Sequence, residues 1–164
     1  FKTKFDKLYS EKWKFVKQIV KVENEITLNQ VSNPDAPLAE WLIQDPQNVN
    51  KFFWLRTLLK KNIEIPKMGR DFIDLAFHVE EKNEEYFVLK SENKLVNQPL
   101  QELSFYTKSY PVSRGLDHPN EISAYMFSEF FKSKYNFREP FQEINEDSKK
   151  NIELFLEWIK SDMR

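Results

Sequence analysis

The stretch from Met68 to Tyr106, MGRDFIDLAFHVEEKNEEYFVLKSENKLVNQPLQELSFY, predicts a strand, a turn, a second strand and then a helix. Side chains alternate between the two faces of a strand, so residues 72–79 place Asp74 on one face and an apolar row on the other. We expect the second strand at about residues 86–94. The polar run at residues 80–85 has the length of a hairpin loop.

A pairing of Glu80 with Tyr86 across this loop would place Asp74 directly opposite Glu92, with Cβ atoms about 5 Å apart. Lys94 shares a strand face with Glu92, so two carboxylates and an amine would converge on one patch. Two carboxylates that close repel each other and are expected to recruit a hard cation, most simply Mg²⁺. The alternative is an exposed hairpin with ordinary surface charges, where an Asp74–Lys94 ion pair adds little stability.

The order Asp, gap, Glu-x-Lys resembles the PD-(D/E)XK nuclease superfamily. One branch of it carries an I-D-L strand end, an E-N-K strand end and a helix opening with Q-x-x-Q-L-x-x-Y. The matching elements here are Ile73-Asp74-Leu75, Glu92-Asn93-Lys94, and Gln98-Pro99-Leu100-Gln101 followed by Phe105-Tyr106. An L-A-W-L-L-D-P element of the same branch resembles residues 38–46, so the likeness runs from about residue 35 to Tyr106.

This resemblance implies an α/β (α+β) fold of the restriction-endonuclease-like kind, with a small mixed β-sheet flanked by helices, over one domain of residues 1–164. It also implies a metal-dependent nuclease that hydrolyses DNA phosphodiester bonds, in a setting of restriction or phage defence. The alternative is a catalytically inactive domain of the same fold that acts in nucleic-acid binding or protein interaction. A third reading is a helical interaction module in which the hairpin is incidental.

The resemblance also implies roles for single residues. Asp74 and Glu92, with the carbonyl of Asn93, would hold Mg²⁺ or Mn²⁺, which polarises the phosphate and activates a water. Lys94 would orient that water and offset developing charge. Gln101 would contact substrate or support the site. Many members draw a further carboxylate from the helix before the first strand. The candidates here are Asp35 and Glu40. Asp35 is typical of a helix N-cap, so we retain Glu40 as the candidate metal ligand.

Composition limits the class of protein. The chain has 164 residues, of which 40% are hydrophobic, and this predicts one domain with a proper core. Cysteine is absent, which excludes disulfides, thiolate zinc sites and cysteine nucleophiles and makes a reducing cytoplasm the expected compartment. Two glycines are too few for glycine-rich phosphate loops. We expect no membrane span, because no apolar run approaches ~18 residues.

The remaining segments predict helices. The hydrophobic spacing of residues 1–22 predicts an amphipathic helix. Its lysine-rich face is either a contact surface for a nucleic-acid backbone or a solvated surface. The net charge of −1 means that any DNA binding must come from such a local patch. Further helices are expected at about 38–43, 49–61 and 120–135, and a last one from Asp147 or Ser148. Residues 107–119 contain no strand-like run, so either the sheet is abbreviated or residues are missing near 112–116.

Overall fold

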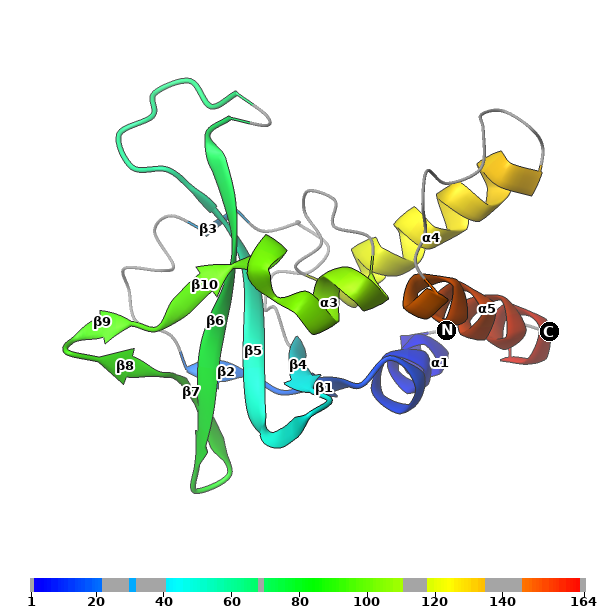
Figure 1. Cartoon of the computed structure of the whole chain (residues 1–164), viewed down its shortest axis with the longest axis horizontal. Coiled ribbons are helices and arrows are strands. Elements are labelled where there is room, and N and C mark those ends of the chain that lie inside the picture. The colour runs from blue at the N-terminus through cyan, green and yellow to red at the C-terminus, as the bar shows by residue number, and fades with distance from the viewer. Residues whose placement is uncertain are drawn as a thin grey trace.

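The computed structural model describes residues 2–21, 30–31, 41–67, 70–110, 118–134 and 146–162. Figure 1 shows a mixed α/β fold in which helices gather on one side of a curled sheet. The elements in chain order are α1 (Lys2–Lys7), the π-helical turn η1 (Leu8–Lys12), β1 (Phe15–Lys17), β2 (Val20–Lys21), β3 (Gln30–Val31), β4 (Trp41–Asp45), β5 (Asn48–Leu59), β6 (Phe72–Lys82), β7 (Glu85–Val88), β8 (Lys90–Ser91), β9 (Lys94–Leu95), β10 (Asn97–Pro99), the 3₁₀ turn η2 (Leu100–Glu102), α3 (Ser104–Ser109), α4 (Pro119–Lys134) and α5 (Glu146–Asp162).

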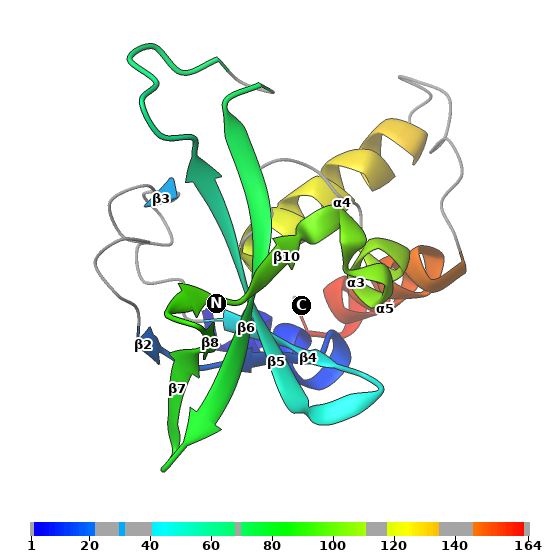
Figure 2. The same cartoon turned by 60° about the vertical axis from the view of Figure 1, so that its left-hand side comes forward.

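The main sheet is a half-barrel with the strand order β1-β4-β5-β6-β7-β2, to which β10 adds on β6 and β3 on β5. The pair β2–β7 is parallel, and the other described pairs in this sheet are antiparallel. The strands β1 and β2 lie at opposite ends of the order, yet only Gln18 and Ile19 separate them in the chain. This short link draws the two ends of the sheet together, so the sheet must curl (Figure 2).

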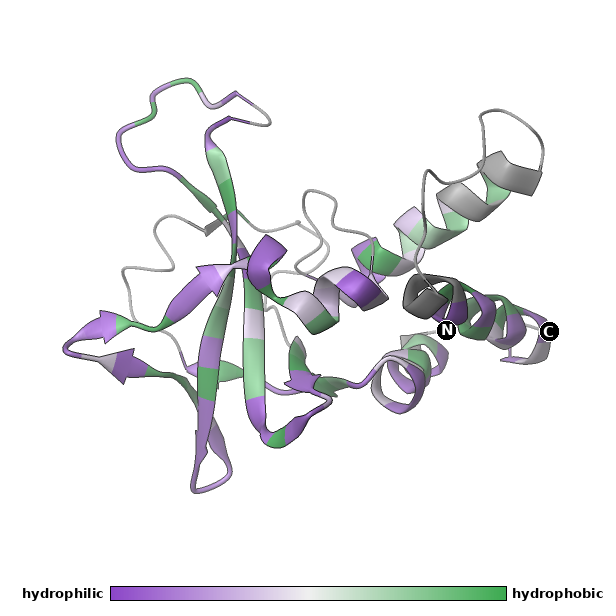
Figure 3. Cartoon of the chain, in the orientation of Figure 1, coloured by the Kyte–Doolittle hydropathy of each residue, from purple (hydrophilic) through white to green (hydrophobic). Residues whose placement is uncertain are grey.

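The long strands β5 and β6 form the centre of the sheet, paired from Phe52 with Val79 through to Leu59 with Phe72. Figure 3 shows β6 as largely hydrophobic, with hydrophilic bands between the hydrophobic stretches and a hydrophilic end toward β7. One face of the pair packs under the helices. The other face builds a second cluster of buried side chains, which are Val20, Leu42, Phe52, Trp54, Phe77, Val79, Tyr86 and Val88.

The helical layer is anchored by aromatic side chains from the ends of the chain and from α3. Tyr9 and Trp13 stack with ring centroids 5.6 Å apart, and both are about 1% exposed. Tyr110 closes this cluster by donating its hydroxyl hydrogen to the Trp13 carbonyl oxygen at 2.7 Å. Burial raises the pKa of the Tyr110 hydroxyl, so it stays protonated and keeps this hydrogen bond. The helical layer is thereby joined to the start of β1.

Two of the expected helices are strands. Residues 41–45 form β4 and residues 48–59 form β5, whereas helices were predicted at about 38–43 and 49–61. Residues 41–43 and 52–55 are continuous apolar runs that are buried at every position, because both faces of these strands are covered there. A short continuous apolar run looks alike in a buried strand and in a buried helix. The part of the first prediction that covers residues 38–40, including Glu40, lies outside the described residues.

The predicted helix over residues 1–22 is also wrong beyond its first turns. It ends after η1, where Lys14 adopts a positive φ of 60°, and the chain then pairs as β1 and β2. The predicted basic face is partly neutralised within the protein. Lys17 lies 2.8 Å from Asp6, Lys21 lies 2.5 Å from Glu85, and Lys4 donates to the Asp162 carbonyl oxygen.

Three other predictions are confirmed. The strand at 72–79 is the core of β6, the helix at 120–135 is α4, and the last helix is α5. Phe127 of α4 is 50% exposed. Two further predictions concern residues outside the described part of the chain. They are the abbreviated sheet or missing residues near 112–116 and the helix N-cap at Asp35. Among the described helices, none has the length and apolar character to cross a membrane.

Candidate functional site

The structure does not place Asp74 opposite Glu92. The β6–β7 hairpin closes through a tight turn at Asn83 and Glu84, both with positive φ, and its register pairs Glu81 rather than Glu80 with Tyr86. The strand β7 then ends at Val88, before it could reach Asp74.

Asp74 instead pairs across β5 with Thr57, whose hydroxyl donates to the Asp74 carboxylate at 2.6 Å. The carboxylate is half-buried on the helix-facing side of β6. Its nearest described polar partner is therefore a neutral hydroxyl. This contact supports the β5–β6 pairing.

Glu92 and Asn93 occupy the tight turn of a second, smaller hairpin formed by β8 and β9. Their φ angles are 49° and 61°, as a two-residue turn of the hairpin type requires. This hairpin projects from the sheet with exposed side chains, among them Lys94 (Figure 1). The triplet Glu92-Asn93-Lys94 is thus the tip of a hairpin and does not end a strand beside Asp74.

The remaining predicted site residues are also dispersed. Gln101 lies in η2 and is exposed, and Glu40 lies outside the described residues. Within the described ranges, no group of three or more His, Asp and Glu side chains is placed to hold a metal ion. The structure therefore does not assemble the predicted metal centre from Asp74, Glu92 and Asn93.

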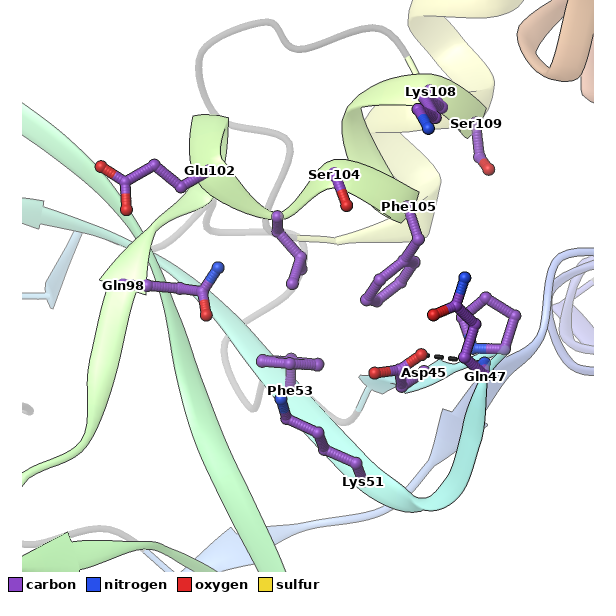
Figure 4. A pocket seen from close by; sticks show the side chains of 12 residues that line it. Asp45, Gln47, Lys51, Phe53, Gln98, Glu102, Ser104, Phe105, Lys108 and Ser109 are labelled. Carbon is purple, nitrogen blue, oxygen red and sulfur yellow. Dashed lines mark hydrogen bonds between the residues drawn. The ribbon is translucent and has the colours of Figure 1, made fainter.

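A pocket of about 540 Å³ lies at the junction of the β4–β5 turn, β10, η2 and α3 (Figure 4). Its lining mixes two acidic side chains, two lysines and two phenylalanine rings. The lining residues are Asp45, Pro46, Gln47, Lys51, Phe53, Gln98, Glu102, Leu103, Ser104, Phe105, Lys108 and Ser109. Segments that are far apart in the chain, the first half of β5 and the β10–α3 segment, thus meet around one cavity.

The β4–β5 turn presents Asp45 to this pocket. Asp45 pairs with Asn48 across Pro46 and Gln47, and its carboxylate accepts the backbone N–H of Gln47 at 2.9 Å. An Asp that hydrogen-bonds the backbone two residues ahead is a typical turn former. The second carboxylate oxygen extends toward the Phe105 ring in Figure 4. The turn therefore fixes a hydrogen-bond acceptor at the pocket edge.

Two phenylalanine rings form the apolar part of the pocket. Phe53 is 1% exposed and forms the floor, while Phe105 is half-buried with its ring centroid 5.8 Å from that of Phe53. Lys51 places its ammonium 5.0 Å from the Phe53 ring centroid. Phe105 is thus the more accessible of the two rings and offers the aromatic surface that a ligand in this pocket could contact.

Gln98 and His78 act as a unit beside the pocket. The Nε2 atom of His78 lies 3.2 Å from Oε1 of Gln98, and the imidazole packs edge-on to Phe53 at 4.8 Å. Burial lowers the pKa of His78, a shift opposed by the Gln98 hydrogen bond and reinforced by Lys51. A carbonyl oxygen only accepts, so Nε2 is the protonated nitrogen of a neutral ring. The Gln98 amide N–H₂ is thereby turned toward the pocket (Figure 4).

A second pocket of about 660 Å³ shares Lys51 with the first. It is lined from β5 and β6 by Lys51, His78, Glu80 and Glu81, with Asn48 and Asn83 at its ends. Lys51 therefore stands where both hollows meet. The acidic and basic groups of the second pocket favour no single class of ligand.

Sequence reasoning missed Asp45, Lys51, Phe53 and Lys108 as members of one site, because the first three were expected on helices or at their ends. One local signal pointed the other way. Asp45-Pro46-Gln47-Asn48 is a turn-forming sequence between two apolar runs, which is typical of a hairpin. Gln98 and Phe105 did appear in the predicted nuclease motif, although for a different reason.

Comparisons with known proteins identify no relative. No family model matches the chain, and neither a curated protein nor a solved structure matches it. The function must therefore be argued from the geometry of the chain itself.

Proposed function

We propose that this chain is a nucleic-acid-binding domain that does not cleave its ligand, and that the pocket takes one nucleotide of a single strand. The observation that carries this proposal is the set of groups around the pocket. A half-buried aromatic ring, Phe105, stands between an amide donor, Gln98, and a carboxylate acceptor, Asp45, with a lysine on either side.

Phe105 supplies the stacking surface. Proteins that bind single strands without strict sequence preference place bases on aromatic side chains, and each stacked base contributes about 1–3 kcal/mol. The Phe105 ring is held in position by Phe53 behind it, so little side-chain freedom is lost when a base stacks. A base on this ring would have its polar edge beside Gln98 and Asp45.

Gln98 and Asp45 supply complementary hydrogen-bonding groups. The amide N–H₂ of Gln98 donates, because His78 occupies its oxygen, and the free carboxylate oxygen of Asp45 accepts. Every base carries both donors and acceptors on its edges, which unstacked single strands leave accessible. The pair therefore suits a base better than an aliphatic ligand, which would leave both groups desolvated without a partner.

Lys51 and Lys108 supply positive charge at the two sides of the pocket, from β5 and α3. A strand that enters the pocket with its base has a phosphate on either side of that nucleotide. Phosphate contacts of this kind give most of the affinity in non-specific binding and make it salt-dependent. The net charge of −1 over the whole chain makes such a local pair of lysines the relevant electrostatic feature.

The nuclease activity implied by the motif order stays a prediction, as do DNA as its substrate, Mg²⁺ or Mn²⁺ as its cofactor, the defence setting and the cytoplasmic location. Its support is the sequence order of Asp74 and Glu92-Asn93-Lys94. The Thr57 contact of Asp74 and the place of Glu92 in a hairpin turn favour the catalytically inactive alternative.

The test is fluorescence anisotropy with a labelled single-stranded oligonucleotide of about 20 nucleotides at several salt concentrations. We expect Phe105→Ala to weaken binding about tenfold or more, which corresponds to about 1.4 kcal/mol. Phe105→Leu keeps the apolar volume but removes the flat ring, so it should weaken binding while its circular dichroism spectrum and melting stay native. The double variant Lys51→Gln/Lys108→Gln should lower both the affinity and the salt dependence.

The matched control is Lys7→Gln/Lys12→Gln, which removes the same charge from exposed positions in α1 and η1. The proposal is wrong if this control weakens binding as much as the pocket variants do, or if Phe105→Leu binds normally. A plasmid assay with Mg²⁺ and Mn²⁺ tests the other candidate. Metal-dependent cleavage that disappears in Asp74→Ala would overturn the non-catalytic reading and support the nuclease.

A further inference from the structure

The connection between β5 and β6 is a projecting, basic arm. We define it as the described residues 60–67, 70 and 71; it extends beyond the rest of the sheet at the top of Figure 1. Its sequence carries four cationic side chains against two acidic ones. The cations are Lys60, Lys61, Lys67 and Arg70, and the acids are Glu64 and Asp71.

The end of the arm is apolar. Ile65 is 77% exposed, more than any other large hydrophobic side chain in the described residues, and Pro66 follows it. Single exposed apolar side chains are common on protein surfaces, and it is the combination of this one with Lys61 and Lys67 on either side of it in the sequence that distinguishes the arm.

The base of the arm is held together by hydrogen bonds around Asp71, a residue that is 3% exposed. The Asp71 carboxylate accepts the backbone N–H of Lys67 at 2.9 Å and is held by the Arg70 guanidinium at 2.8 and 2.9 Å. The Asp71 carbonyl oxygen in turn accepts the N–H of Lys60 at 2.9 Å. These bonds tie the two sides of the arm together, so its tip is presented by a fixed base.

We propose that this arm binds duplex DNA, with Ile65 inserted into the minor groove and Lys61 and Lys67 placed against the phosphates on its two sides. Apolar wedges such as isoleucine and proline are inserted between base steps by proteins that bind the minor groove, and lysines and arginines flank them. The minor groove is narrow, so Ile65 enters it while the two sides of the arm stay outside it at the phosphates. Neutralised phosphates release counterions, which drives the association.

A membrane surface is the other ligand that attracts a basic arm with an apolar tip. The arm carries Glu64 between Ile63 and Ile65. Insertion of both isoleucines into lipid would take this carboxylate out of water, which is costly. Insertion of Ile65 alone into a groove does not require the exposed Glu64 carboxylate to leave water, so the duplex is the better-matched partner.

The arm and the pocket lie at opposite ends of β5. Lys51 and Lys61 are ten positions apart in the chain, and at about 3.3 Å per residue along β5 this places their Cα atoms roughly 30 Å apart. The arm contact is therefore independent of the pocket. This inference does not require that the pocket takes a nucleotide.

The test is anisotropy of a labelled A·T-rich duplex over a range of salt concentrations. The double variant Lys61→Gln/Lys67→Gln should lower the slope of log affinity against log salt by about two and weaken binding roughly tenfold at low salt. Lys67→Gln alone should lower the slope by about one. Ile65→Ala should weaken duplex binding several-fold with no change of salt slope, since it removes no charge.

The outcomes separate this inference from the proposed function. Phe105→Leu should leave duplex binding unchanged, and the arm variants should leave single-strand binding unchanged. The arm proposal is overturned if Lys7→Gln/Lys12→Gln reduces duplex binding as much as the arm lysines do, or if Ile65→Ala binds normally. It is also overturned if Ile65→Ala and Lys67→Gln reduce binding to phosphatidylserine vesicles while duplex binding is absent.

Discussion

The two ends of β5 carry similar side chains in different settings. At the pocket end, Lys51 lies beside buried Phe53, and β10 and α3 form a wall around them. At the arm end, Lys61 precedes exposed Ile65 by four positions, on a connection that projects beyond the rest of the sheet in Figure 1. A cation and an apolar side chain thus form a concave site in one place and a projecting one in the other.

The difference lies in what covers the strand. The pocket end is packed from three directions, so its rings are held in the core and its polar groups have defined partners. The arm end is held through its base at Asp71, and Ile65 is 77% exposed, so the tip is accessible to a large ligand. The same residue types therefore point to a small or unstacked ligand at one end and to a duplex at the other.

The largest expected effect tests whether the pocket end is part of the core. Phe53→Ala should cost about 3–5 kcal/mol of unfolding free energy, because it removes a buried ring packed on His78 and Phe105. Ile65→Ala at the arm end should change it by less than about 0.5 kcal/mol. Urea denaturation measures both values. Equal losses would mean that Ile65 is packed in solution and would remove the contrast.

A smaller effect tests the base of the arm. The hydrogen bonds from Arg70 and then from the Lys67 backbone lower the pKa of Asp71 to about 2, below its unfolded value of about 3.9. The ionised form is thus favoured by folding. Its stabilising contribution is complete above about pH 5 and is lost as pH falls through 4 toward 2. Asp71→Asn should speed amide exchange in the arm at neutral pH and remove this acid dependence.

Amide exchange in the pocket segments serves as the internal control for that experiment. Residues 45–53 and 98–109 should keep their protection in Asp71→Asn. Loss of protection at both ends would show that the arm and the pocket unfold together, against the independence argued above.

The pocket end has its own pH window. Burial lowers the pKa of His78 below its unfolded value of about 6.5, so the folded state favours the neutral ring. Stability from this group is present above about pH 6.5 and declines as pH falls from there toward the lowered pKa, because the unfolded chain binds the proton more readily. His78→Gln should flatten this part of the stability curve. A protein that gains stability on mild acidification would contradict it.

The smallest expected effect concerns the β8–β9 turn. Glu92 holds a φ of 49°, which costs a non-glycine residue stability and which asparagine tolerates better. Glu92→Asn should therefore raise the unfolding free energy, on the order of 0.5 kcal/mol. The same exchange at exposed Glu102 should bring no gain. A clear loss at Glu92 would indicate that this carboxylate has a role beyond the turn.

Part of the fold could be predicted from local pattern. The alternation around Asp74 identified β6 and the face on which this carboxylate lies, and the helical periodicity near Ile122 and Phe155 identified α4 and α5. These segments have one face clearly more apolar than the other. The segments that were misassigned, β4 and β5, are covered on both faces and lack that contrast.

The candidate site was less accessible to sequence reasoning. The predicted partnership of Asp74 with Glu92 assumed a five-residue loop and one continuous second strand. The chain instead makes two tight turns, at residues 83–84 and 92–93, in which both residues have positive φ. Each turn contains one asparagine, which favours positive φ, and one glutamate, which does not. Each turn shifts the register of all that follows, so a small local error moves the site residues apart.

The sequence by itself determined the composition of this protein, the faces of β6 and its later helices, because these depend on neighbours along the chain. Only the tertiary structure decided that β4 and β5 are strands, that the sheet curls through the link between β1 and β2, and that Phe105 meets Asp45 and Gln98 around one pocket. Those outcomes depend on which distant segments pair, and pairing is set by the burial of surfaces that no local window contains.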